Sequence, residues 1–293
     1  MNKIINIMLK NDFIVPNYNN PNVVDLVRAI YSKYNIKTEI NKNVETFKKI
    51  IPNNKHVLFI LSDGTGSNLI NKLSDNFILK KNRKEDIITV FPSTTACVLT
   101  SIVTAEFPEV HGIWGWFNYD RNLNINYCPL LFCDRKTEIN LLNYGIKPKQ
   151  VFLQHSLLND LKTNVTRDVV LDFEEYDNMF YAYPSIDYGT ASYYIKKGYE
   201  DAFEKLFNDK YDDDMILFKT EDLINNNFFG IGNFKSSAKD NLGEYISICQ
   251  KERYLINDPN VEKYYGKIKG NHSGLSCDEM IIPLIIIDTN SES

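Results

Sequence analysis

Three hydroxyl residues, Ser93, Thr94 and Thr95, follow Pro92 at the start of an apolar stretch that is expected to form a helix. The β-branched segment 86–91 before them is typical of a buried strand, so the hydroxyls stand at a strand-to-helix turn. A hydroxyl in that position caps the helix when its oxygen accepts a bond from a first-turn N–H. Alternatively it attacks a phosphorus, because helix N-termini at the carboxyl ends of strands bind anions. The turn by itself is compatible with a cap and with a nucleophile.

Carboxylates and a histidine stand at comparable positions, next to other predicted strands. The continuously apolar segment 56–62 is typical of a parallel strand covered on both faces, and Asp63 follows it directly. Three further residues occupy such positions: Asp187 after a strand expected at 179–183, Asp222 after one at 215–218, and His272 before a last one at 281–287. One hydroxyl, three carboxylates and one imidazole at one edge of a sheet are a suitable set of ligands for divalent metal ions.

The order of the predicted elements indicates an α/β fold. Strands alternate with helices, which implies a three-layer α/β/α sandwich with a mostly parallel central sheet. We find no internal repeat, and we expect a single domain over 1–293, with a helical lead-in at about 1–54 and a cap or lid insertion at about 118–150. The remaining helices are expected at 22–34, 44–51, 69–73 and 193–207, with a further short strand at 151–153.

The composition is that of a soluble globular protein and argues against several function classes. Of 293 residues, 43% are hydrophobic and 24% are charged, which suffices for one large core. The net charge of -5 and the lack of a sustained Lys/Arg stripe argue against binding to nucleic acid or to an anionic membrane. The scattered cysteines form no C-x-x-C pair, so neither a disulfide framework nor a cysteine zinc site is indicated. Without a signal-peptide h-region or a membrane-length apolar run, the chain is expected in the cytoplasm.

Four stretches together resemble the alkaline phosphatase superfamily, specifically its type I phosphodiesterase/nucleotide pyrophosphatase branch. LFILSDGTGSNL at 58–69 is similar to the first metal-binding strand and loop of that branch, and FPSTTACVLTSIVTAEFPEVHGIWGW at 91–116 is similar to its nucleophile helix and His-Gly-Ile turn. YPSID at 183–187 resembles the segment of the middle metal-ligand aspartate, and GNHSGLSCDEMIIPL at 270–284 resembles the closing histidine segment. The order and spacing of the four stretches extend the resemblance over about residues 55–287.

The resemblance implies a mechanism and a set of site residues. The nucleophile falls on Thr95, which is also a metal ligand, and water then hydrolyses a phosphothreonine intermediate. A threonine hydroxyl is weakly nucleophilic at neutral pH, so the resemblance also implies two divalent ions, zinc in this branch, that stabilise the attacking and leaving oxygens. Asp63 and Asp222 would bind one ion, and Asp187 and His272 would bind the other.

Weaker candidates for contact with the substrate are Thr94, Trp116 and Asn118. The indole ring could stack on a nucleobase, although aromatic clusters are more often part of a core. His111 in the His-Gly-Ile turn is not a metal ligand in the branch and is expected to be structural. The expected substrate is a small phosphoester, with nucleotide-like compounds among the candidates.

The sequence departs from the branch at three positions. Ala191 and Leu223 stand where the branch has histidine ligands, and Val98 stands where it has a phosphate-contacting asparagine. With fewer imidazoles, the site would be richer in oxygen and would favour Mn²⁺ or Mg²⁺ over Zn²⁺. The alternative is a catalytically inactive relative that binds a phosphate-bearing ligand or a protein partner. In an active enzyme, the missing histidine ligands could be replaced by Thr65, Glu221 or Asp212 to Asp214.

A third interpretation concerns the glycines that follow Asp63. Gly64 and Gly66 give the G-x-G of a dinucleotide-binding turn. Leu69 stands where the third glycine is needed, and no Gly-Lys-Ser/Thr follows for a P-loop. The loop is therefore a weak match to a nucleotide cofactor site.

Overall fold

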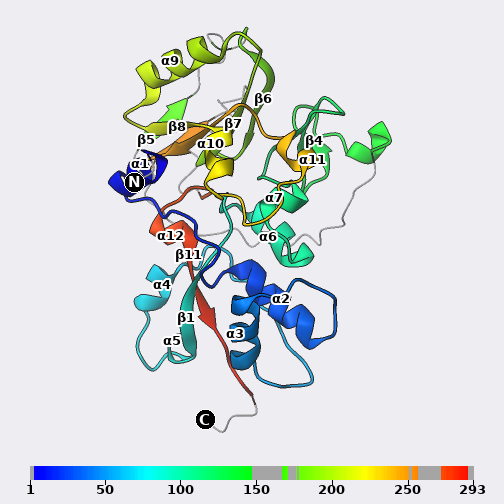
Figure 1. Ribbon diagram of the computed structural model, residues 1–293, viewed down its shortest axis with the longest axis vertical. Helices are drawn as coiled ribbons and strands as arrows, with labels where there is room; N and C mark the ends of the chain where they lie inside the picture. The colour runs from blue at the N-terminus through cyan, green and yellow to red at the C-terminus, as the bar shows by residue number, and fades with distance from the viewer. Residues whose placement is uncertain are drawn as a thin grey trace.

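The structure, a computed structural model, describes residues 3–146, 167–170, 176, 178–250, 253–256 and 272–289. It is a mixed α/β structure, as predicted (Figure 1). The helices of these residues are α1 (Lys3–Lys10), α2 (Val23–Lys33), α3 (Lys42–Ile50), α4 (Ser67–Asn71), α5 (Ile78–Lys81), α6 (Thr95–Thr104), α7 (Pro108–His111), η1 (Leu141–Tyr144), α9 (Glu200–Tyr211), α10 (Thr220–Asn225), α11 (Ser236–Lys239) and α12 (Cys277–Met280). The strands are β1 (Arg83–Ile88), β2 (Asn118–Asp120), β3 (Ile125–Cys128), β4 (Cys133–Asp134), β5 (Arg167–Val170), β6 (Phe180–Ile186), β7 (Thr190–Ile195), β8 (Met215–Lys219), β9 (Tyr245–Cys249), β10 (Arg253–Ile256) and β11 (Ile281–Ile285). The strand predicted at 151–153 lies outside the described residues.

The sheets differ from the prediction, because most of their strands pair antiparallel. The largest sheet has the strand order β6-β7-β9-β8, and each neighbouring pair in it is antiparallel. The sheets β1-β11 and β2-β3-β4 are also antiparallel, and β5-β10 is the one parallel pair among the described strands. The prediction of a mostly parallel central sheet is therefore wrong for the part of the chain that the structure describes.

A tight turn explains the direction of β7. Residues 187–189 connect β6 to β7, and a connection this short joins only antiparallel neighbours, because parallel strands need a crossover of about a dozen residues. The segment Thr190–Ile195 is buried along its whole length and consists largely of β-branched and aromatic residues, which favour a strand. The helix predicted at 193–207 therefore begins later, as α9 at Glu200.

The segment 56–62 has no regular secondary structure. The side chains of Leu58 and Ile60 are 83% and 76% exposed, and no described strand pairs with this segment. An apolar run forms a stable strand only where neighbouring strands satisfy its backbone hydrogen bonds, and β1 pairs with β11 instead. The prediction of a buried strand at 56–62 is therefore wrong.

Replacing Leu58 by serine is expected to change the free energy of unfolding by less than about 0.5 kcal/mol, because an exposed side chain loses few contacts. The matched control is Leu284→Ser in β11, where burial of the side chain should make the same substitution cost about 2 kcal/mol or more. Urea unfolding of both variants and of the unsubstituted protein measures the two costs. Equal costs at the two positions would contradict the exposed position of Leu58.

Three large apolar clusters hold the elements together. One packs α9 on the four-stranded sheet (Figure 1). It includes the rings of Tyr193, Phe203 and Phe207. A second packs α1, α10 and α12 around β6, β8 and β9 and includes Phe91 and Leu223. The third joins α2, α3, β1 and α6. No helix in the described ranges is long and apolar enough to cross a membrane.

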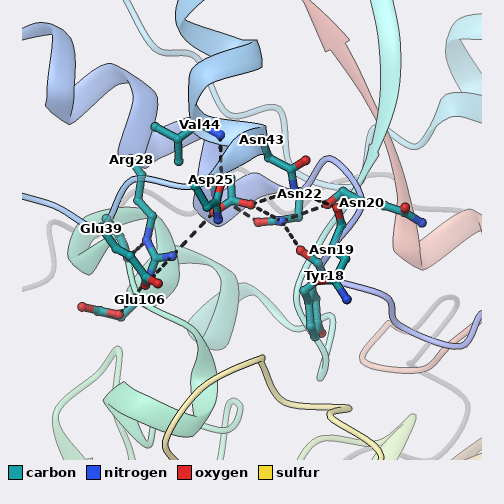
Figure 2. Close-up of polar contacts among 12 residues, drawn as sticks. Tyr18, Asn19, Asn20, Asn22, Asp25, Arg28, Glu39, Asn43, Val44 and Glu106 are labelled. Carbon is teal, nitrogen blue, oxygen red and sulfur yellow. Dashed lines mark hydrogen bonds and ion pairs between the residues drawn. The ribbon is translucent and has the colours of Figure 1, made fainter.

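A buried carboxylate fixes the N-terminal helices α2 and α3 to each other. Asp25 in α2 is fully buried, and its oxygens accept bonds from Asn22 Nδ2 at 2.7 Å and Asn43 Nδ2 at 3.0 Å (Figure 2). A third amide, Asn41 Nδ2, donates to the same carboxylate at 2.8 Å, and Arg28 Nη1 lies 3.6 Å from it. Because a buried charge needs such partners, this network holds the N-terminal helices together.

Candidate functional site

The hydroxyls of Thr94 and Thr95 meet two different carboxylates at the start of α6. Thr94 Oγ1 donates to Asp187 Oδ2 at 2.9 Å, and both side chains are buried. Thr95 Oγ1 donates to Asp63 Oδ2 at 3.5 Å, at a more exposed position. Thr94 is the N-cap residue of α6, but its side chain makes no capping hydrogen bond. The interpretation of these hydroxyls as simple helix caps is therefore wrong, because both are directed to carboxylates.

Asp187 is buried in the turn between β6 and β7. Burial is the largest influence and raises the pKa of its carboxyl above the ordinary value, whereas His272, the Tyr188 N–H and the Thr94 hydroxyl act in the opposite direction. Tyr188 N donates to Asp187 Oδ1 at 2.9 Å. Burial raises the pKa of Asp187 more than these partners lower it, so a further positive charge beside the carboxylate would stabilise its ionised form.

His272 lies next to Asp187, and its Nδ1 is 3.9 Å from Asp187 Oδ2. This nitrogen is buried and has no hydrogen-bond partner among the described residues. Two bonds hold the histidine segment against the β6-β7 turn: Thr190 Oγ1 donates to Ser273 O at 2.6 Å, and Gly189 N donates to Ser273 Oγ at 3.1 Å. A buried imidazole nitrogen without a partner, beside a buried carboxylate, is an arrangement suited to binding one cation between them.

Backbone strain and close packing surround these two side chains. Ile186 precedes Asp187 with a φ of 83°, and Ser273 follows His272 with a φ of 90°. A positive φ is costly for residues other than glycine, above all for β-branched ones, and such strain is concentrated at functional sites. A Cβ on Gly189 would lie 2.5 Å from His272 O, so only glycine permits this close approach.

The sequence patterns do not point to Gly189, Thr190 or Ser273 as parts of the site. Gly189 carries the one local signal, because a glycine two residues after an aspartate is typical of a tight turn. The bonds to Ser273 join residues more than 80 positions apart, and no local pattern encodes them.

The second pair of predicted ligands, Asp63 and Asp222, lies at exposed positions. Asp63 is exposed beside Thr95, and Asp222 is exposed in the first turn of α10. No group of three or more Asp, Glu, His and Cys side chains in the described ranges lies close enough to hold an ion. The structure thus joins Asp187 to His272 and Asp63 to Thr95, and an ion shared by Asp63 and Asp222 stays a prediction.

A protein-family model matches residues 57–131, the segment that contains Asp63, Thr94 and Thr95. This segment matches the type I phosphodiesterase / nucleotide pyrophosphatase family. Asp187 and His272 lie beyond the matched residues and are joined to the site by geometry. Comparisons with curated proteins and with solved structures gave no match.

Packing explains why this chain has Leu223 and Ala191 at the two positions where the phosphodiesterase branch has histidines. Leu223 is fully buried in the same apolar cluster as Phe91 and Phe228. Consecutive residues of a helix point about 100° apart, so α10 can expose Asp222 while it buries Leu223. Ala191 is fully buried within β7. An imidazole at either position would enter the core without a polar partner.

We expect Leu223→His to destabilise the protein by about 2 to 4 kcal/mol instead of completing a metal site, because it places a polar ring in the apolar core. The matched control, Leu223→Met, keeps the apolar volume and should cost less than about 1.5 kcal/mol. Thermal unfolding with and without Zn²⁺ measures both effects. If zinc stabilises Leu223→His more than it stabilises the unsubstituted protein, the core position of residue 223 is contradicted.

The residues considered as substitute ligands have other partners or are exposed. Asp212 and Asp213 lie at the surface after α9. The partners of the others are Lys239 for Glu221 (2.7 Å), Arg253 for Asp214 (2.8 Å) and Ser62 for Thr65 (2.7 Å). Thr65 stands two residues after Asp63, and Glu221 directly precedes Asp222.

Asn118 and Trp116 belong to a loop that is closed by its own polar groups. Asn118 is buried, its Oδ1 accepts from Trp114 N at 2.8 Å, and its Nδ2 donates to Gly115 O at 2.7 Å. Trp116 is partly buried in a small apolar cluster with Tyr188. These contacts are structural, and a role of either residue in substrate binding stays a prediction.

His111 also has a structural environment. Its Nδ1 accepts from Ile113 N at 3.0 Å, and its Nε2 lies 2.9 Å from Ser101 Oγ in α6. Burial lowers the pKa of His111 to about 3, so the ring is neutral and Nε2 donates to the serine. The histidine thus fixes the turn after α7 to helix α6.

Close packing accounts for Gly66 without a nucleotide cofactor. A Cβ there would lie 2.7 Å from Asp278 O in α12. The helix that follows, α4, has five residues and Gly66 as its N-cap. The glycine therefore serves the contact between α4 and α12, which weakens the dinucleotide interpretation further.

Proposed function

We propose that the chain is a metal-dependent phosphoester hydrolase with Thr95 as its nucleophile. The family match supports phosphoester hydrolysis at the level of the family. The observation that carries the proposal is the pair of neighbouring contacts at the start of α6, Thr95 to Asp63 and Thr94 to Asp187. Each contact joins one hydroxyl at the N-terminus of α6 to one carboxylate, and a phosphate group binds favourably at a helix N-terminus.

The donor set fits one divalent cation. Asp187 offers a buried carboxylate with a raised pKa, and His272 offers a buried nitrogen without a hydrogen-bond partner. Both Zn²⁺ and Mn²⁺ accept such nitrogen and oxygen ligands. A cation held there would supply the positive charge that lets a phosphate approach the carboxylates. Asp63 and Thr95 are the candidates for holding a second ion.

The chain's own groups would position the reacting atoms. Asp63 accepts the hydrogen bond of the Thr95 hydroxyl and so orients its oxygen. Thr94 orients the Asp187 carboxylate in the same way. The first-turn N–H groups of α6 have no side-chain cap and can donate to an anionic oxygen of the substrate. Attack of the Thr95 oxygen on phosphorus would break the bond to one ester oxygen, which would leave as an alcohol with the proton of the threonine hydroxyl. The phosphothreonine formed from a diester would keep the second ester group, and water would then break the bond between phosphorus and the Thr95 oxygen.

Removal of metal tests this proposal. We expect the protein equilibrated with Mn²⁺ or Zn²⁺ to hydrolyse bis(p-nitrophenyl) phosphate, to lose this activity in a chelator, and to regain it when the ion is returned. Elemental analysis should find at least about one ion per chain, and fewer in an Asp187→Ala, His272→Ala double variant. Equal hydrolysis with and without chelator would contradict the proposal.

The second candidate is an inactive relative that binds a phosphate-bearing ligand. The burial of Leu223 and Ala191, at the two positions where the branch has histidine ligands, favours it. In that case, phosphate or a phosphoester should raise the unfolding temperature of the protein while no hydrolysis occurs with any of the three ions Zn²⁺, Mn²⁺ and Mg²⁺.

A further inference from the structure

Tyr18 lies outside the family-matched segment, yet its hydroxyl contacts the loop that leads to the proposed nucleophile. Phe91 N donates to the Tyr18 hydroxyl oxygen at 2.9 Å, four residues before Thr95. The same hydroxyl donates to Phe228 O at 3.0 Å. Tyr18 is fully buried, so one hydroxyl joins two separate loops inside the core.

Phe228 connects this hydroxyl to helix α10. Its backbone N donates to Leu223 O at 3.1 Å, and its ring meets Phe91 edge-on with the ring centroids 6.2 Å apart. Leu223 is the neighbour of Asp222 in α10. These contacts form a bridge that starts at the segment before Thr95, passes through the Tyr18 hydroxyl and Phe228, and ends at α10, the helix that carries Asp222.

Tyr18 is itself held in place. Asn22 Nδ2 donates to Tyr18 O at 3.1 Å (Figure 2), and Asn22 is the N-cap residue of α2. The Tyr18 ring packs on Phe107, with the centroids 4.9 Å apart. Burial raises the pKa of Tyr18 well above its ordinary value, so the hydroxyl keeps its proton and remains a donor to Phe228 O. The bridge thus passes through a fixed point.

We propose that Tyr18 is a positioning residue that holds the Thr94–Thr95 turn in register with α10. The inference rests on the proposed function, because it takes Thr95 as the nucleophile. A misplacement of about 1 Å can cost about 100-fold in rate. Loss of the Tyr18 hydroxyl should therefore lower kcat about 10- to 100-fold and change KM little, since Tyr18 is buried in the core.

Tyr18→Phe tests the proposal, because it removes the bridging oxygen and keeps the ring. The matched control is Tyr31→Phe, which also removes a hydroxyl that donates to a backbone carbonyl, here Val103 O at 2.6 Å, in the last turns of α6. Amide hydrogen exchange is measured for peptides covering 88–98 and 223–230, and kcat and KM are measured with bis(p-nitrophenyl) phosphate and Mn²⁺. We expect Tyr18→Phe to speed exchange in both peptides and to lower kcat, and Tyr31→Phe to change neither.

Two results would overturn the positioning role: unchanged exchange in Tyr18→Phe, or faster exchange with an unchanged kcat. If the unsubstituted protein hydrolyses no ester, the proposed function fails. The positioning role is then judged from hydrogen exchange only, by whether Tyr18→Phe speeds exchange in both peptides. If Tyr18→Phe does not fold, the Phe91 amide of the unsubstituted protein decides. It lies outside β1, so exchange as slow as that of β1 supports the bridge, and fast exchange overturns it.

Discussion

Replacing Thr95 by alanine is expected to lower phosphodiester turnover by about 10³-fold or more, because removal of a covalent nucleophile leaves only binding and electrostatic contributions. Thr95→Ser keeps the hydroxyl and should retain turnover within about tenfold. Steady-state rates with saturating Mn²⁺ measure both values. Mass spectrometry of acid-quenched protein should also find a p-nitrophenyl phosphoryl group on Thr95 after reaction with bis(p-nitrophenyl) phosphate, and none in Thr95→Ala.

Thr94 provides the control for this experiment, because it stands next to Thr95 and contacts a different carboxylate. Thr94→Val removes the donor to Asp187 and should weaken metal binding, but a phosphoryl group should still be found on Thr95. Unchanged turnover in Thr95→Ala, or a larger loss in Thr94→Val, would contradict the assignment of the nucleophile.

Asp187→Asn is expected to weaken binding of the metal ion by at least about 100-fold, since loss of a direct ligand should cost no less than loss of an outer-shell partner. The substitution keeps the shape of the side chain and one oxygen acceptor for the Thr94 hydroxyl or the Tyr188 N–H. Titration with Mn²⁺, followed by elemental analysis, measures the affinity. Equal affinities would show that Asp187 does not bind the ion.

Asp187→Asn weakens metal binding, but it is expected to stabilise the metal-free protein. Burial raises the pKa of Asp187 in the folded state. At a pH between the pKa of Asp187 in the unfolded chain and its pKa in the folded chain, the side chain therefore keeps its proton in the folded chain and has lost it in the unfolded chain. Stability therefore falls as the pH rises through that window and stays lower above it. In a chelator at neutral pH, Asp187→Asn should be more stable than the unsubstituted protein, and this difference should disappear at a pH below the window. A less stable Asp187→Asn at neutral pH would contradict the cost of burying this charge.

The residues of the candidate site, including the neighbouring pair Asp187 and His272, could be predicted from the resemblance, whereas the contact of Thr94 with Asp187 could not. Thr95 and Asp63 lie in short segments whose order and residue types resemble one family, and the match to 57–131 agrees with that resemblance. The contact of Asp187 with Thr94 joins residues 93 positions apart, so it follows from the fold and not from a local pattern. The same holds for the Tyr18 bridge to Phe228, which spans 210 positions.

The errors in the predicted fold have one physical origin, because apolar runs do not specify their partners. The segment 56–62 has the composition of a buried strand, but burial depends on neighbouring strands that the segment itself does not encode. The direction of β7 likewise depends on the short turn at 187–189, not on the composition of the strand. The bounds predicted for α2 and α3 agree with the structure within two residues, because apolar spacing at the helical period is a local signal.

The pairing of β1 with β11 has a consequence for synthesis of the chain. Ile88 pairs with Ile281, and Ser93 Oγ donates to Gly274 O at 2.9 Å, so the segment that leads to Thr95 is held by residues that are translated much later. At about 5 to 20 residues per second, that segment waits roughly 10 to 40 s for these partners. During this interval the edge of β1 that pairs with β11 stays open on the ribosome. A nascent chain of this kind is a suitable substrate for a chaperone that binds extended apolar segments. The yield of folded protein should therefore depend on translation speed.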